Sequence, residues 1–468
     1  MEDSAPVIMG SSTDNTLTIN AEKDQTASVT LSGVNIDVSG AGKAAVSTTG
    51  AGNVSIELNG ESKLKSGEKH AGLEKNNGGR LTIAGEDKNG KLTAEGGDWG
   101  AGIGGGYGGN GSDITISDGE VNATGGWGGA GIGGGYGGNG SDITISGGDV
   151  KATGGLGRAG IGGGADGNGN NIAISGGKIK ATGGDLGGAG IGGGSAGYGS
   201  EEGAGVGGGR DGNGNNIAIS SGVVTAIGGV SGAGIGGGGW HGSGSDITIS
   251  GGEVKAIGDL GGAGIGGGPW GKGKDITVSG AAKLKVQGGV EDDVDGAGAG
   301  IGDGGRSQIP GAEVEPDTSG LLTTGWIEYY APGADMEKDK PTSTTFGTSS
   351  QPEKPIERGA DAPLYRMTDR DGRDMAYMAE QTGGMLTVTV DEDFAVLTGS
   401  LSDMTALRTQ GVEKFVFVTR GATSAFLLSD LLSKGESGEA YWLTHDGKAV
   451  TFTLGESMAD VSAILTKP

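Results

Sequence analysis

The stretch Ala130–Gly148, AGIGGGYGGNGSDITISGG, decides the fold of this chain. Its first half carries almost no side chains, and its second half alternates Ile with Thr. Glycine loses more conformational freedom on folding than any other residue, so a glycine-rich stretch normally indicates a flexible linker. This stretch recurs at a regular spacing, however, which a flexible linker does not need.

The motif Ala-Gly-Ile/Val-Gly repeats at steps of 29, 29, 30, 15, 29, 30 and 36 residues. Its copies begin at Ala101, Ala130, Ala159, Ala189, Ala204, Ala233, Ala263 and Ala299. A period of about 20 to 50 residues indicates a solenoid, in which each unit buries its apolar face by stacking on its neighbours. The step of 15 predicts a half-unit insertion around residues 195–203 that bulges from the stack.

Each repeat contains three short extended segments. In the repeat that begins at Ala130, residues 142–146 alternate with period two, which places Ile143 and Ile145 on one face. Residues 150–152 alternate again after a glycine bend, and the Ala-Gly-Ile segment supplies the third strand. Helix is disfavoured because each interior Gly costs about 1 kcal/mol relative to Ala. The sequence predicts a mainly β fold, a parallel β-helix with three-strand coils of about 29–30 residues, followed by a small α+β domain.

Stacking of the coils places equivalent residues in columns. Successive coils are about 4.8 Å apart. One predicted inward column contains Ile103, Ile132, Ile161, Ile191, Val206, Ile235 and Ile265. A second contains Ile116, Ile145, Ile174, Ile219, Ile249 and Val278. We expect the solenoid to begin with the strand at residues 29–38.

The chain divides into three predicted parts. Residues 1–302 form the solenoid with atypical N-terminal coils, residues 303–360 form a linker or strap that contains Pro, Ser and Thr, and residues 361–468 form the small α+β domain. In that domain we expect strands at 364–367, 385–390, 415–418 and 450–454, and helices at 402–409, 425–432 and 458–465.

Composition limits the partners. The net charge of −25 is spread along the chain without basic runs, which disfavours nucleic acid and anionic membrane surfaces. There is no Cys, and no apolar run is long enough to insert into a membrane. Because Met1-Glu2-Asp3 does not open a signal peptide, a leader and any wall anchor would lie outside this sequence.

Aromatic residues flank the glycine-rich motif and are the candidate ligand-binding residues. They are Trp99, Tyr107, Trp127, Tyr136, Tyr198, Trp240 and Trp270. Rings on turns along one edge of a rigid rod would form a platform for sugar rings, because an aromatic face packs on apolar surface while polar edges stay hydrated. In the alternative interpretation, Trp99 and Trp127 align with Leu156 and Leu260 and pack as a column beneath a loop.

The second glycine of the motif is the candidate interaction face. We expect Gly102, Gly131, Gly160, Gly190, Gly234 and Gly264 to point outward and to leave backbone that a second chain, a glycan or the C-terminal domain can approach closely. In the alternative interpretation, these glycines only satisfy sharp local dihedral angles.

Other chemistry is weakly supported by the sequence. Glu120 and Asp149 fall in one column and could approach as a carboxylate pair for glycoside hydrolysis, but an exposed ladder of mixed charges is the favoured interpretation. Residues 137–142 partly fit a calcium-binding nonapeptide, and an Asx turn is the alternative. The 3 His residues are far apart. We therefore assign no catalytic residue, metal ligand or cofactor.

The segments Val29–Ile36 (VTLSGVNI) and Gly79–Gly85 (GRLTIAG), with the repeated AGIGGG and DITISGG, resemble the glycine-rich repeat regions of secreted surface proteins of gut Firmicutes. The resemblance covers about residues 27–302, and Leu364–Asp369 (LYRMTD) also resembles modules of such proteins. Those proteins are described as carbohydrate-binding or adhesin-like. The resemblance implies an extracellular or cell-wall β-solenoid that contacts a glycan or another host or bacterial surface component.

Two alternatives to this adhesin-like function remain. The chain could be a polysaccharide lyase or glycoside hydrolase of the β-helix class, or a structural spacer that self-associates into a rod. We expect binding rather than catalysis.

Overall fold

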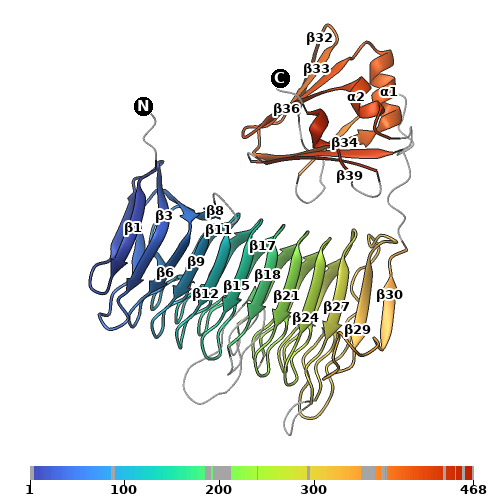
Figure 1. The fold of residues 1–468 in the computed structure, drawn as a ribbon. Coiled ribbons are helices and arrows are strands. Elements are labelled where there is room, and N and C mark those ends of the chain that lie inside the picture. Colours follow the sequence, from blue (N-terminus) through green and yellow to red (C-terminus); the bar gives the residue numbers. More distant parts are fainter. Residues whose placement is uncertain are drawn as a thin grey trace. The chain divides into compact units, whose positions relative to one another are not determined.

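The computed structural model (Figure 1) describes residues 5–85, 90–184, 191–192, 212–239, 241–291, 296–348, 364–369, 375, 377–435, 439–447, 449–455 and 459–465. The chain forms two compact units, Met1–Ser350 and Gln351–Pro468. The first is a parallel β-solenoid and the second is a small strand-rich domain, so the predicted fold class is confirmed.

Each central coil of the solenoid gives one strand to each of three columns, and the strands within a column pair in parallel. The first column contains β5 (Asn53–Asn59), β8 (Leu81–Gly85), β11 (Gly111–Ile116), β14 (Gly140–Ile145), β17 (Gly169–Ile174), β20 (Gly214–Ile219), β23 (Gly244–Ile249) and β26 (Gly273–Val278). The second contains β6 (Glu61–Lys65), β9 (Lys91–Glu95), β12 (Glu120–Thr124), β15 (Asp149–Thr153), β18 (Lys178–Thr182), β21 (Val223–Ile227), β24 (Glu253–Ile257), β27 (Lys283–Gln287) and β29 (Trp326–Tyr330). The third contains β2 (Leu17–Ala21), β4 (Val46–Gly50), β7 (Leu73–Lys75), β10 (Ile103–Gly104), β13 (Ile132–Gly133), β16 (Ile161–Gly162), β19 (Ile191–Gly192), β22 (Ile235–Gly236), β25 (Ile265–Gly266) and β28 (Ile301–Gly302).

The predicted isoleucine columns are the core of the stack. In the third column, Ile132 pairs with Ile103 and Ile161. In the first column, Ile145 pairs with Ile116. These side chains are fully buried. Val206 was assigned to the column wrongly: Ile191 pairs directly with the next isoleucine, Ile235. The extra half-unit therefore lengthens the chain between two coils without adding a coil, and Val206 itself lies outside the described residues.

The solenoid begins earlier than predicted. β1 (Val7–Ser12) pairs in parallel with β3 (Thr26–Asp37), and β2 pairs with β4, so two strands precede the predicted start at residue 29. β3 is long enough to pair with both β5 and β6. The first coil was missed because β1 contains Gly10 at a register shift, which interrupts the alternation that marks a strand in the sequence.

The prediction that the second glycine of each motif points outward is wrong. The five described members, Gly102, Gly131, Gly160, Gly234 and Gly264, are all buried, and Gly190 lies outside the described residues. The motif folds back on itself, with the Ala130 backbone N–H donating to the Gly134 carbonyl at 2.9 Å.

The physical reason is the close approach of two other backbone segments. A Cβ on Gly131 would lie 2.5 Å from the Gly160 carbonyl oxygen of the next coil and 2.7 Å from the Thr153 nitrogen of β15 in its own coil. Such contacts are shorter than real Cβ contacts. These glycines therefore allow the coil to close, and they offer no exposed backbone to a partner.

An asparagine ladder that the sequence analysis missed connects the turns before the first-column strands. The Asn110 side-chain oxygen accepts the Asn139 backbone N–H at 2.9 Å, and the Asn139 oxygen accepts the Asn168 N–H at 2.8 Å. Asn168 and Asn213 continue the ladder in the same way. Each side chain thus satisfies a backbone donor of the next coil, which explains Asn at this position.

We expect Asn139→Ala to lower the free energy of unfolding by about 1–2 kcal/mol, because the part-buried Asn168 N–H loses its acceptor. Urea unfolding followed by circular dichroism measures the change. Lys151→Ala is the control, since Lys151 is exposed on β15 in the same coil and should change stability by less than about 0.5 kcal/mol. Equal effects of the two substitutions would show that the ladder contributes nothing.

Residues 303–348, the first part of the segment predicted as a linker or strap, continue the stack. β29 pairs in parallel with β27, and β30 (Ser343–Phe346) pairs antiparallel with β29. Glu313 accepts the backbone N–H groups of Gly300 at 2.7 Å and Ile301 at 3.1 Å, which are the donors at the end of the third column. The last coil is therefore closed by this segment.

The described residues of the second unit form two sheets and two short helices. The 5-stranded sheet has the order β31 (Arg366–Thr368), β34 (Phe394–Ser400), β37 (Ala440–Asp446), β38 (Ala449–Leu454) and β39 (Ala459–Asp460). The 4-stranded sheet has the order β32 (Met378–Thr382), β33 (Met385–Thr389), β35 (Lys414–Val418) and β36 (Thr423–Leu427). The helices are α1 (Leu401–Thr409) and α2 (Leu428–Leu432), and a 3-10 turn covers Ser462–Ile464.

Some predicted elements of this unit are confirmed and others are wrong. The strands predicted at 385–390, 415–418 and 450–454 and the helix at 402–409 are present as β33, β35, β38 and α1. The helix predicted at 425–432 is wrong in its first part, where Phe426 of β36 pairs with Phe415 of β35. The helix predicted at 458–465 is also wrong, because β39 and the 3-10 turn occupy this segment.

Candidate functional site

Four of the seven predicted aromatic residues come together at turns of neighbouring coils. The Trp99 ring lies edge-on to Trp127, Tyr136 and Tyr107, with centroid distances of 4.2, 4.9 and 6.3 Å. Tyr107 and Tyr136, which hold the same position in successive coils, stack with their planes 1° apart and their centroids 5.4 Å apart. We call these four residues the aromatic cluster.

The backbone makes room for the aromatic cluster. Trp99 has a φ of 75°, and its carbonyl accepts the Tyr136 N–H at 2.9 Å. A Cβ on Gly128 would lie 2.9 Å from Cε3 of the Trp99 ring. Residue 128 in the next coil must therefore be glycine for the Trp99 ring to pack against that coil.

The rings of the cluster differ in exposure. Tyr107 is 56% exposed, whereas Trp99, Trp127 and Tyr136 are half-buried. Arg158 lies 5.7 Å from the Trp127 ring centroid, is itself buried, and has its pKa lowered to about 10 by that burial. Packing thus accounts for Trp99 and Trp127, and Tyr107 is the ring with a free surface.

The other predicted aromatic residues are not part of the cluster. Trp270 is 37% exposed and lies 6.0 Å from the His241 ring, in a turn farther along the stack. Tyr198 and Trp240 lie outside the described residues. Trp270 belongs to the coil of β25, five steps from the coil of β10, so stacking separates it from Tyr107 by about 24 Å along the solenoid.

The charged column forms a ladder of ion pairs. Glu120 and Asp149 are register partners in β12 and β15, as predicted. Lys91 Nζ lies 2.9 Å from the Glu120 carboxylate, and Lys178 Nζ lies 3.3 Å from the Asp149 carboxylate. Hydrogen bonds from Lys91 and Asn122 lower the pKa of Glu120, whereas a general acid needs a raised pKa.

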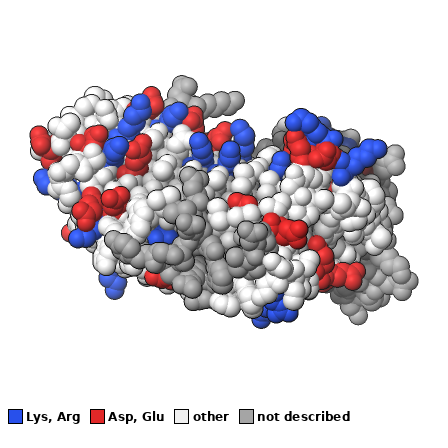
Figure 2. All heavy atoms as spheres, turned by 90° about the horizontal axis from the view of Figure 1, so that it is seen from below, with Lys and Arg blue, Asp and Glu red and all other residues white. Residues whose placement is uncertain are grey.

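Charges of both signs are interspersed on one face of the molecule (Figure 2). Figure 2 shows Lys and Arg beside Asp and Glu on the face seen from below, with wide uncharged areas between them. Among the described residues, no group of three or more His, Asp or Glu is arranged to hold a metal ion. No helix in the described part of the chain is long and apolar enough to cross a membrane.

The residues that suggested calcium have a conformational role. Asp142 has a φ of 53°, and so do its equivalents in other coils to within a few degrees: Asp113, Asn171, Asn216, Asp246 and Asp275. Asp and Asn enter this left-handed region more readily than other residues with side chains. The left-handed backbone conformation at this position therefore explains why it is Asp or Asn in each of these coils.

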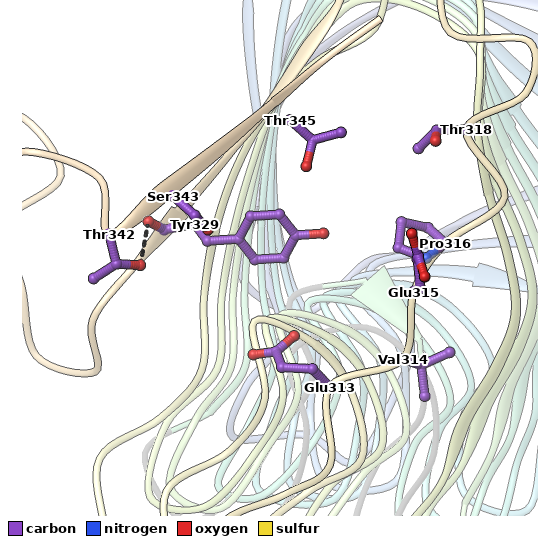
Figure 3. A pocket seen from close by; sticks show the side chains of 9 residues that line it. All are labelled: Glu313, Val314, Glu315, Pro316, Thr318, Tyr329, Thr342, Ser343 and Thr345. Carbon is purple, nitrogen blue, oxygen red and sulfur yellow. Dashed lines mark hydrogen bonds between the residues drawn. The ribbon is translucent and has the colours of Figure 1, made fainter.

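A pocket that the sequence analysis missed lies at the C-terminal end of the solenoid. Its volume is about 400 Å³, and it is lined by Glu313, Val314, Glu315, Pro316, Thr318, Tyr329, Thr342, Ser343 and Thr345. Figure 3 shows the Tyr329 ring between Glu313 and Thr345, with its hydroxyl directed toward Pro316. We call this cavity the end pocket.

The geometry of Tyr329 is fixed on several sides. Its ring packs against Gly300, where a Cβ would lie 2.9 Å from ring atom Cδ1. Its carbonyl accepts the Thr342 hydroxyl at 2.9 Å. Burial, with smaller effects of the charges of Glu313 and Glu315, raises the pKa of Tyr329 to about 12. The phenol is therefore a protonated hydrogen-bond donor at neutral pH.

The sequence and the fold agree with one group of known proteins. A family model described as a beta helix repeat matches residues 88–107, 114–136, 143–165, 172–195, 217–239 and 247–269. No curated protein and no solved structure matches the chain. The match and the three-column parallel stack agree on a β-helix repeat solenoid in the first unit.

Proposed function

We propose that this chain is an extracellular or wall-displayed solenoid that contacts glycans and acts in adhesion. The observation that carries the proposal is the exposed Tyr107 ring, which is stacked on Tyr136 and supported at its edge by Trp99. A ring held in this way presents a flat apolar surface, on which the apolar face of a sugar packs while its hydroxyl groups remain in water.

The regular stack supports the proposal. The register of the coils fixes the turns that carry Tyr107 and Trp270, about 24 Å apart. A glycan polymer on a host or bacterial surface could contact both rings at once. The second contact would then be intramolecular and would strengthen binding without any new type of interaction.

We expect Tyr107→Ala to weaken binding to the glycans that the full chain recognises on a glycan array by about 10-fold, because the substitution removes about 1–1.5 kcal/mol of ring packing. Trp270→Ala should have an effect in the same direction. Val223→Ala is the matched control, since Val223 is exposed on β21 and belongs to neither turn. Unchanged binding in both aromatic variants, or no glycan binding by the full chain, would overturn the proposal.

Catalysis and a purely structural role are the competing functions. Glu120 and Asp149 are adjacent, but lysines neutralise both carboxylates in an exposed ladder. Release of reducing ends from polysaccharides that Asp149→Asn abolishes would favour a hydrolase or lyase. Self-association of the full chain without any glycan binding would favour a spacer.

A further inference from the structure

The last coil of the solenoid leaves a cavity next to inward positions that aliphatic side chains fill in the coil below. Thr277 of β26 forms a parallel bridge with Asp317, which places Pro316 and Thr318 over the inward positions of Ile276 and Val278. In the second column, Tyr329 lies in register with Val286. Ile276, Val278 and Val286 are at most 3% exposed and fill the coil below.

Replacement of this aliphatic filling by Pro316, Thr318 and Tyr329 leaves the end pocket. Its volume of about 400 Å³ lies in the range of small-molecule sites, about 300 to 1,000 Å³. Residues 313–318 form one wall, and the β29–β30 hairpin forms the other. The cavity is therefore built by the coil register rather than by a chance depression between loops.

The lining of the end pocket is amphipathic. The apolar surfaces are the Tyr329 and Pro316 rings, and hydroxyl groups come from Thr318, Ser343 and Thr345. The Tyr329 ring approaches Gly300 through Cδ1 and Cε1, and Tyr329 also lines the cavity.

The charges of the end pocket are negative. Glu313 is occupied with the backbone N–H groups of Gly300 and Ile301, whereas Glu315 lies on the cavity wall as a further carboxylate. Among the nine described residues that line the cavity, none is Lys or Arg. The lining can accept hydrogen bonds from hydroxyl groups and will repel an anion.

We propose that the end pocket binds a single uncharged pyranose ring and rejects acidic sugars. The sugar's apolar face packs on Tyr329, and its hydroxyl groups donate to Glu315 and exchange hydrogen bonds with Thr318 and Thr345. This inference rests on the proposed glycan contact and specifies a second subsite and its selectivity. Like charge disfavours a uronate or sulfate here because it would meet two carboxylates with no cation in the wall.

In the test, the full chain is titrated with the methyl glycosides of glucose, galactose, mannose and N-acetylglucosamine. The charged ligand is the methyl glycoside of galacturonic acid, which carries a free carboxylate and is called the galacturonate below. Binding is followed by saturation-transfer NMR and by chemical-shift changes. We expect at least one neutral glycoside to bind and the galacturonate not to bind. Thr345→Val should lower the affinity for the neutral glycoside by about 3- to 10-fold, because one hydrogen bond is lost.

Two further variants sharpen the test. Thr344→Val is the matched control, because Thr344 is the neighbour of Thr345 in β30 and does not line the cavity. Glu315→Gln removes one negative charge and should shift the preference toward the galacturonate. Glu315 is exposed and Thr344 is half-buried, so neither change should prevent folding.

The outcomes separate this inference from the proposed function. Loss of array binding in Tyr107→Ala with no effect of Thr345→Val would leave the proposed function intact and overturn the end-pocket inference. Weaker glycoside binding in Thr345→Val but not in Thr344→Val would support the inference, whatever Tyr107→Ala does. Equal binding of galacturonate and neutral glycosides, or binding of none of them, would overturn it.

Discussion

Gly133→Ala is expected to lower the free energy of unfolding of the solenoid by about 4 kcal/mol. Gly133 has a φ of 134°, in a region that residues with side chains rarely adopt. A Cβ at this position would lie 2.0 Å from the carbonyl oxygen of Gly162 in the next coil. Relief of this clash would require the two coils to separate, and that separation would disrupt the pairing of Ile132 with Ile161.

Urea unfolding of the full chain, followed by far-ultraviolet circular dichroism, measures the loss. Gly137→Ala is the matched control, because Gly137 also has a positive φ, of 73°, but a Cβ there would meet no atom within 4 Å. The control should cost only about 1–2 kcal/mol, the conformational term alone. If the two variants lose the same stability, the contact between coils does not explain the glycine at residue 133.

The periodic part of the fold could be predicted because one repeat contains nearly all the information for the next. The spacing of 29 residues between Ile103, Ile132 and Ile161 is the register of the third column itself. The same argument fails within a motif. Simple alternation assigns Gly131 to the outside, whereas the backbone of the next coil and of β15 lies so close that Gly131 is buried.

The ends of the solenoid could not be predicted from the period. β1 and β29 lack the glycine motif, so only their pairing with β3 and β27 reveals them as members of the stack. In the second unit, the segment around Phe426 contains good helix formers but becomes a strand because β35 offers a partner. Tertiary pairing overrides local propensity at such positions.

The candidate site was predictable in part for the same reasons. Tyr107 and Tyr136 are 29 residues apart and therefore stack, but nothing in the spacing places Trp99 between their turns. The end pocket depends on the bridge between Thr277 and Asp317. These residues are 40 positions apart, and the repeat does not predict their contact. The apolar run of β29 was the only available signal.

The second unit contains a buried histidine that should make its stability depend on pH. His445 is fully buried, with its ring stacked on Phe417 at a centroid distance of 4.2 Å. Nδ1 lies 3.0 Å from the Thr419 hydroxyl oxygen, and Nε2 lies 2.8 Å from the Ser424 hydroxyl oxygen. Burial lowers the pKa of His445 from 6.5 to about 4, because the charged ring would lose its hydration.

The unfolded chain therefore takes up a proton on His445 near pH 6.5, whereas the folded chain does so only near pH 4. Between these values the unfolded state binds more protons, so this residue lowers the free energy of unfolding as the pH falls, by up to about 3 kcal/mol. Above pH 6.5 the stability is fully present, and below pH 4 this residue causes no further loss.

His445→Gln should remove this part of the pH dependence, even though loss of the ring also lowers stability at pH 7.5. The measurement is the free energy of unfolding of the second unit in the full chain between pH 7.5 and 4, taken as the difference between the wild type and the variant. His241→Gln, at an exposed ring in the first unit, is the control and should leave the profile unchanged. A wild-type profile that parallels that of His445→Gln would mean that His445 takes up its proton equally in the folded and unfolded chain, and that its burial has no energetic consequence.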